Sequence, residues 1–306
     1  MIRAEHCRNL LHMSDTRRSS GKFVAAVRKR ACRLACRMGR EPVLDRPVFV
    51  VGCGRSGTTI LGDTLGVHSS VTYLNEPRHL WANAYPATDV WSDRAGSRGG
   101  RLDLAESDRT AARDRALRVN FHCETAATGR PRLVEKLPIN NFRLAFISTI
   151  FPDALFVNLL RNGLEVARSI ERMPEEKFWY GHDDYKWKLL AEYAGRSERY
   201  RDLVPLCDTP RRRGLLEWRV SVEVADEFFA AMPAERHTSV TYAELLDRPT
   251  EVIRRIEEFA GLTPSETVHS FAVANLQRRS PKIDVTRLSD TEERLAGELM
   301  RRLGYV

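Results

Sequence analysis

A short apolar run that ends in a glycine-rich turn constrains the fold of this chain more than any other feature. Residues 48–51 (VFVV) are continuously apolar, as expected of a strand buried inside a parallel sheet. The turn that follows runs from Gly52 to Gly57, and residues 58–65 then have apolar side chains at helical spacing. A strand, a tight turn and a helix in this order predict an α/β fold.

Strands and helices continue to alternate along the rest of the chain. We expect further strands at residues 71–74, 133–135, 154–160 and 236–242. We expect further helices at residues 141–151, 163–173, 186–200, 215–231, 250–260 and 291–303. Residues 86–113 are polar and weakly patterned, so a loop or lid is expected there. The alternation predicts a P-loop-type parallel sheet covered by helices on both faces.

The charge distribution divides the chain into two parts. Residues 1–46 hold 12 Lys and Arg against 4 Asp and Glu, which accounts for the whole net charge of +8, because residues 47–306 carry 37 of each sign. We therefore expect a basic, partly disordered N-terminal arm over 1–46, with a basic helix at 23–38, and one domain over 47–306. Nucleic-acid binding by the near-neutral domain is not expected, although the arm could touch an acidic membrane surface or nucleic acid.

The sequence also bears on location and on metals. It has no run of 18 apolar residues and no secretory signal pattern, which favours a cytoplasmic location. Arginine outnumbers lysine 42 to 7, which is typical of a GC-rich bacterial genome. Cys32 and Cys36 share one helix face at i, i+4, but two ligands do not make a structural zinc site. We therefore expect reduced thiols and no metal.

The glycine-rich turn has the composition of an anion site. Residues 52–59 keep P-loop spacing, but Thr58 stands where a nucleotide-hydrolysing P-loop protein has lysine. Glycines let consecutive N–H groups converge on an anion, and the helix N-terminus adds partial positive charge. The phosphate site is predicted to consist of Gly54, Arg55, Ser56, Gly57, Thr58 and Thr59. The strand at 154–160 is followed by Arg161 instead of an acidic residue, which argues against a Mg²⁺-dependent hydrolase.

A second anion site is predicted after the strand at 154–160. Arg161 lies at the carboxyl end of that strand, where ligands bind in such sheets, and Ser169 lies two helical turns further on. Both side chains could reach one phosphate, which an arginine can bind bidentately.

Together these two segments resemble the paired donor-binding motifs of sulfotransferases that use 3′-phosphoadenosine-5′-phosphosulfate (PAPS). The segments are GRSGTT at residues 54–59 and FVNLLRNGLEVARS at residues 156–169, and their form resembles the protein-tyrosine and carbohydrate branch. Residues 135–138 (EKLP), 151–154 (FPDA) and 240–261 are also similar to that family, so the resemblance covers roughly residues 47–305. It implies that the first motif holds the 5′-phosphosulfate and the second the 3′-phosphate, without a metal.

Three residues are predicted to have catalytic roles in such a transfer. Arg55, with the amides of the turn, would stabilise charge on the leaving oxygen, and Lys136 would be the second cation. Glu76 stands 21 residues after Arg55, as a glutamate does in the tyrosine-sulfating branch, and is the expected general base. Its alternative role is an ion pair with Arg78 or Arg55. His79 is the rival base, while His68 and His122 are weaker candidates.

The acceptor is the least specified part of the reaction. Residues 178–182 and Trp187 form an aromatic cluster that suits a small-molecule, carbohydrate or aromatic hydroxyl acceptor, or ordinary core packing. Arg279 and Ser280 resemble a late loop that closes over the nucleotide in this family. The alternatives to a sulfotransferase are a P-loop small-molecule kinase and a non-enzymatic nucleotide or nucleic-acid binding module.

Overall fold

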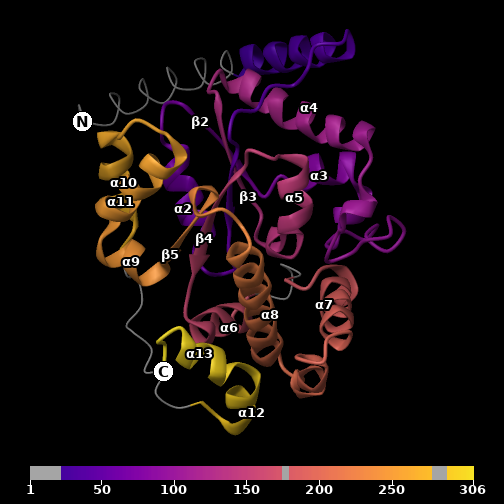
Figure 1. The fold of residues 1–306 in the computed structure, drawn as a ribbon, viewed down its shortest axis with the longest axis vertical. Coiled ribbons are helices and arrows are strands. Elements are labelled where there is room, and N and C mark those ends of the chain that lie inside the picture. The colour runs from indigo at the N-terminus through magenta and orange to yellow at the C-terminus, as the bar shows by residue number, and fades with distance from the viewer. Residues whose placement is uncertain (1–21, 174–178, 278–287) are drawn as a thin grey trace, which may run out of the picture.

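The protein is built around a five-stranded parallel sheet, seen in a computed structural model that describes residues 22–173, 179–277 and 288–306 (Figure 1). The strands run in the order β2-β3-β1-β4-β5, and each neighbouring pair is parallel. Their bounds are β1 Val48–Val51, β2 Val71–Asn75, β3 Arg132–Lys136, β4 Leu155–Leu160 and β5 His237–Thr241. The predicted parallel α/β fold is confirmed.

The central strand β1 is buried along its whole length, which explains its unbroken apolar sequence. Phe49 and Val51 belong to one hydrophobic core, and Val48 and Val50 belong to a second core on the other face. Successive side chains of a strand point to opposite faces, so β1 contributes to both cores at once.

Helices cover both faces of the sheet, with α9, α10 and α11 on one side and α3, α4 and α5 on the other (Figure 1). The helices before β4 are α2 Thr58–Gly66, α3 Arg78–Ala84, α4 Ala111–Thr128 and α5 Leu144–Ile150. Those after it are α6 Gly163–Glu171, α7 Tyr185–Gly195, α8 Pro210–Ala230, α9 Tyr242–Asp247, α10 Pro249–Ala260, α11 Glu266–Asn275, α12 Asp290–Glu292 and α13 Glu298–Arg302. A five-residue π-helical segment joins α12 to α13.

Local sequence signals explain where several helices begin and end. Thr110 caps α4 by accepting a hydrogen bond from the Arg113 N–H, and Gly129 ends the helix in a left-handed conformation. Helix α10 begins at Pro249, a residue that is common in the first turn of a helix, and Gly261 ends it in a left-handed conformation, as Gly129 ends α4.

Most of the predicted elements are present in the structure, and the differences are as follows. The helix expected at 186–200 ends at Gly195. The expected helix at 141–151 begins instead as a 3₁₀ turn, Pro138–Arg143, and continues as α5. The loop expected at 86–113 holds two short 3₁₀ turns but ends earlier, because α4 already begins at Ala111. Helices α3, α4, α9 and α11 were not expected, since their apolar residues are few or are broken up by polar ones.

The expected basic helix is present over residues 22–37 and contacts α4. Arg115 donates to the carbonyl oxygens of Cys36 and Arg40 at 2.9 and 3.1 Å, and Lys29 pairs with Glu124. Residues 1–21 lie outside the described part, so the division of the chain at residue 46 stays a prediction. No helix in the described ranges is long and apolar enough to cross a membrane.

Candidate active site

The glycine-rich turn between β1 and α2 depends on two glycines in the left-handed half of φ space. Gly52 has φ 138° and Gly57 has φ 99°. A Cβ on Gly52 would lie 2.4 Å from the carbonyl oxygen of Leu159 on β4, so the turn passes too close to β4 for any side chain. The Gly52 N–H donates to Asn141 Oδ1 at 2.8 Å, which fixes the turn to the segment before α5.

The turn presents hydrogen-bond donors for which the described part of the chain offers no side-chain acceptor. No side chain caps α2, so the N–H groups of its first turn need another acceptor. The Ser56 hydroxyl is buried and has no partner among the described residues. Unsatisfied donors at a helix N-terminus are suited to an anion, and an orphaned buried hydroxyl is rare without a ligand.

The second predicted motif meets the first one directly. Arg161, at the end of β4, donates to the Arg55 carbonyl oxygen at 2.8 Å. The Arg55 Nε donates to Ser169 Oγ on α6 at 3.1 Å. Burial, and then the neighbouring Arg161 charge, lower the pKa of the Arg55 guanidinium. Arg161 also forms an ion pair with Glu165 at 2.8 Å, whereas no ion pair with a carboxylate is found for Arg55 among the described residues. The Arg55 charge is therefore open to an anionic ligand.

A pocket of roughly 260 Å³ lies over these two motifs, which we call the donor pocket. Its walls are Gly54, Arg55, Gly57, Thr58, Thr59, Ile60, Asp63, Glu76, Pro138, Arg161, Ser169 and Trp179. Seven of the ten residues predicted to bind the donor are therefore in its wall, and Ser56 is buried within the turn itself. Arg279 and Ser280 lie outside the described residues.

Glu76 and Lys136 form an ion pair at the edge of the donor pocket. Lys136 Nζ lies 2.9 Å from Glu76 Oε1 and donates to Thr59 Oγ1 at the same distance. Arg78 binds the other oxygen of Glu76 at 2.6 Å. Burial raises the pKa of the Glu76 carboxyl, but the charges and hydrogen bonds of Lys136 and Arg78 outweigh burial and hold that pKa below 4.5. Glu76 is therefore ionised at neutral pH.

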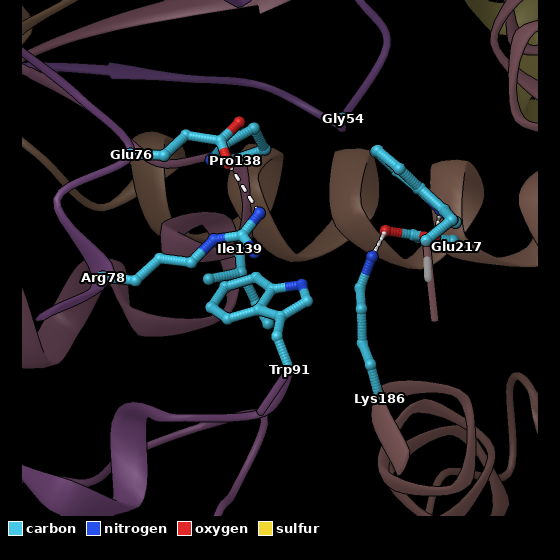
Figure 2. Close-up of a pocket in the computed structure, with 9 residues that line it drawn as sticks. Gly54, Glu76, Arg78, Trp91, Pro138, Ile139, Lys186 and Glu217 are labelled. Atoms are coloured by element: carbon cyan, nitrogen blue, oxygen red, sulfur yellow. Dashed lines mark hydrogen bonds and ion pairs between the residues drawn. The ribbon is translucent and has the colours of Figure 1, made fainter. Parts of the chain in front are cut away.

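A smaller pocket of about 60 Å³ adjoins the donor pocket, and we call it the side pocket (Figure 2). The two pockets share Gly54, Glu76, Pro138 and Trp179, and the side pocket adds Arg78, Trp91, Ile139, Lys186 and Glu217. Figure 2 shows the Arg78 guanidinium between Glu76 and the Trp91 ring, whose centroid is 4.0 Å away. Glu76 and Trp179 thus lie on the boundary between the pockets.

Sequence reasoning missed the far wall of the side pocket. Lys186 and Glu217 form a buried ion pair, and Trp179 Nε1 donates to Glu217 Oε2 at 3.0 Å. The available signals were the scarcity of lysine and a glutamate, Glu217, that stands between the apolar residues Leu216 and Trp218 of α8. Of the predicted aromatic cluster, Trp179 lines both pockets, Tyr180 and Trp187 pack with the core, and Phe178 lies outside the described residues.

The rival bases lie elsewhere in the structure. His79 is exposed on α3, and His68 is buried against the carbonyl oxygen of Thr263. His122 lies on α4, where its Nδ1 is 2.9 Å from the Val43 carbonyl oxygen. No histidine of the described ranges lines either pocket.

Comparison with known proteins gives a consistent family relationship. Residues 47–266 match the model of the sulfotransferase family. Nodulation protein NoeE of Sinorhizobium fredii is 27% identical over 236 residues, which cover 72% of this chain and 51% of NoeE. Protein-tyrosine sulfotransferase 2 of Gallus gallus is 25% identical over 224 residues, which cover 72% of this chain and 52% of that protein. The chain thus spans about half the length of these curated relatives.

Solved structures agree at the level of the fold. A sulfotransferase of Mycobacterium avium superposes with a TM-score of 0.52 at 14% identity, covering 85% of this chain and 77% of the other. A sulfotransferase of Mycobacterium tuberculosis gives 0.50 at 17% identity, covering 90% of this chain and 83% of the other.

Proposed function

The chain belongs to the sulfotransferase family, and we propose that it transfers a sulfuryl group from PAPS to a hydroxyl or amine of an acceptor. One observation carries the choice of donor. Arg161 and Ser169 of the second motif contact Arg55 of the first, so two anion-binding groups face one pocket. A nucleotide with a phosphosulfate at one end and a 3′-phosphate at the other matches two such groups.

The residues present fit this donor. The 5′-phosphosulfate would be held by the free N–H groups of α2 and the hydroxyls of Ser56, Thr58 and Thr59. The 3′-phosphate would be held by Arg161 and Ser169. We propose that Arg279 and Ser280, as the family resemblance implies, close over the nucleotide. When bound, the donor supplies the sulfuryl group.

Two cations are placed to stabilise negative charge as it develops on the oxygen that leaves with the nucleotide. Arg55 lines the donor pocket, and the buried Lys136 contacts Thr59 and Glu76 in its wall. Lys136 is buried and held by two partners, so it would need little reorganisation when the charge forms, while Arg55 is held through Ser169.

Glu76 is our proposed general base. It lies on the boundary of the two pockets, where an acceptor in the side pocket would meet a donor in the other. As an ionised carboxylate it can accept the acceptor proton while the oxygen or nitrogen attacks in line. Its low pKa makes it a weak base, so accurate positioning must provide much of the rate.

The side pocket sets the character of the proposed acceptor. Trp91 and Trp179 offer flat apolar surfaces, while Arg78, Lys186 and Glu217 offer hydrogen bonds and charge. This mixture suits a sugar or an aromatic hydroxyl compound. The name of the chicken relative refers to protein tyrosine, whose side chain is an aromatic hydroxyl compound.

Titration calorimetry without metal is the decisive test of this function. We expect 3′-phosphoadenosine-5′-phosphate to bind with a micromolar dissociation constant and AMP, which lacks the 3′-phosphate, to bind far more weakly. A preference for Mg-ATP would replace the proposal with a small-molecule kinase. Binding of nucleic acid through residues 1–46, with no nucleotide binding, would replace it with a binding module.

A further inference from the structure

A cluster of sulfur and nitrogen atoms joins the helix at residues 22–37 to α4, on a part of the chain that the proposed reaction does not use. A ring nitrogen of His122 and the sulfurs of Cys32 and Cys36 all lie within 4.8 Å of one another. Cys123 adds a fourth group, because its sulfur lies 2.7 Å from that of Cys32. All four side chains are buried or half-buried.

We propose that Cys32, Cys36, Cys123 and His122 bind a zinc ion. Three thiolates and one imidazole are a complete ligand set for a structural zinc site. Ligand sulfurs about 2.3 Å from a tetrahedral ion lie about 3.8 Å apart, a spacing that the atoms of Cys32, Cys36 and His122 already approach. Cys123 is close to Cys32 but is not within 4.8 Å of all three, so its side chain would have to turn toward the ion. Pairing at i, i+4 on one helix supplies two ligands, and adjacent positions on α4 supply the other two.

The surroundings of the cluster match those of metal ligands. The Val43 carbonyl oxygen can only accept, so His122 Nδ1 carries the proton and the ring's lone pair lies on Nε2. Metal-binding histidines are commonly oriented by such a bond to a backbone carbonyl. The Arg115 guanidinium donates to the Cys36 carbonyl oxygen at 2.9 Å and places positive charge beside the thiolates.

A disulfide between Cys32 and Cys123 is the competing interpretation. Their sulfurs are closer than zinc ligands but further apart than the about 2.05 Å of a bonded pair. A disulfide would use two of the four groups and would not explain why Cys36 and His122 also lie close to Cys32. Zinc uses all of them, and it would fasten the basic helix to α4 across 91 residues of sequence.

The experiment is metal analysis of the full-length, untagged chain, purified with a phosphine reductant, incubated with zinc and then desalted. We expect about one zinc ion per chain. Cys32→Ser and His122→Gln should each lose most of the metal. Cys207→Ser is the matched control. Cys207 is also buried, but its thiol donates hydrogen bonds to the Leu203 and Arg212 carbonyl oxygens and lies outside the cluster. This variant should keep its zinc.

Cobalt substitution of the wild-type chain gives a readout that does not depend on the folding of a variant. Thiolate-to-cobalt charge transfer together with tetrahedral d–d bands is expected. A wild-type chain without metal, or zinc retained at the wild-type level in Cys32→Ser and His122→Gln, would overturn the site. A metal-free chain that is purified without reductant and whose Cys32 and Cys123 peptides are linked in non-reducing digests would replace it with the disulfide. The inference is independent of the proposed reaction, since calorimetric nucleotide binding is measured separately.

Discussion

Lys136 Nζ lies 2.9 Å from Glu76 Oε1, and the Glu76 N–H donates to the Lys136 carbonyl oxygen at 2.7 Å. Neighbouring strands β2 and β3 thus end in opposite charges that are joined through both side chain and backbone. The lysine side chain is 1% exposed, whereas the glutamate is 32% exposed and reaches the boundary of both pockets. The buried partner therefore holds the accessible one in place.

Glu76→Gln tests whether the carboxylate acts as a base. The amide keeps the size and can still accept from Lys136, but it cannot take a proton. We expect kcat to fall by about 10²–10⁴, with the dissociation constant of 3′-phosphoadenosine-5′-phosphate nearly unchanged. Steady-state kinetics and calorimetry measure the two quantities. An unchanged kcat would leave Glu76 only the structural ion pair.

Lys136→Met tests the cation that lowers the Glu76 pKa. Methionine fills a similar volume without charge, so the pKa of Glu76 should rise toward or above its ordinary value. Glu76 acts in its ionised form, so the acid limb of the kcat profile should move to higher pH as that pKa rises. The maximal rate should also fall by about 10²–10³, because one stabilising cation is lost. An acid limb at the wild-type position would contradict the coupling.

The first motif and the sheet could be predicted from sequence because their signals are local. The apolar run 48–51 and the glycines of the turn fix a strand and its exit without reference to distant residues. The order of motifs along the strands then placed Arg161 near Arg55. The carboxyl ends of parallel strands meet at one edge of the sheet, so the family resemblance and the order of the strands were enough to predict that Arg161 lies near Arg55.

Long-range pairings account for what the sequence did not predict. Lys186 and Glu217 lie on different helices, and neither is part of a recognisable motif. The approach of His122 to Cys32 likewise depends on how the helix at 22–37 packs on α4. The expected absence of a zinc site counted only ligands near in sequence, whereas tertiary packing brings His122 to Cys32 and Cys36 as a further candidate ligand.

Arg161→Ala tests the second anion site. Losing a charged hydrogen bond costs about 1.5–3 kcal/mol, so donor affinity should fall about 10- to 150-fold. Arg172→Ala is the matched control, because Arg172 is exposed just beyond α6 and lines neither pocket. Calorimetry with 3′-phosphoadenosine-5′-phosphate and with AMP separates the 3′-phosphate contribution. Equal losses for both nucleotides would move the 3′-phosphate away from Arg161.

Gly57→Ala tests how closely the turn packs against β5 and α9. A Cβ there would lie 2.5 Å from the Tyr242 ring, which stacks 4.4 Å from the Arg161 guanidinium. Donor affinity should therefore fall at least about tenfold. This loss comes from the displaced ring and is separate from the about 1–2 kcal/mol by which the left-handed conformation destabilises an alanine. Gly39→Ala has a similar φ of 100° but open space around it, so it should show strain alone. Wild-type affinity in Gly57→Ala would show that Tyr242 moves freely.

Glu135→Gln tests the buried carboxyl behind the site. Burial raises the pKa of Glu135 to about 8, while the hydrogen bond from Trp81 Nε1 acts in the opposite direction. A carboxyl whose pKa is higher folded than unfolded stabilises the fold fully below the unfolded value, near 4.5, and loses that stability as pH rises toward 8.

The variant cannot ionise, and its amide oxygen can still accept from Trp81. Its unfolding free energy relative to wild type should therefore increase between pH 5 and pH 9 in urea titrations. Glu76→Gln should show no such increase over the same range, because the Glu76 pKa lies below it. A pH-independent difference for Glu135→Gln would mean that Glu135 is already ionised in the folded protein at neutral pH, with Lys136 as its nearest compensating charge.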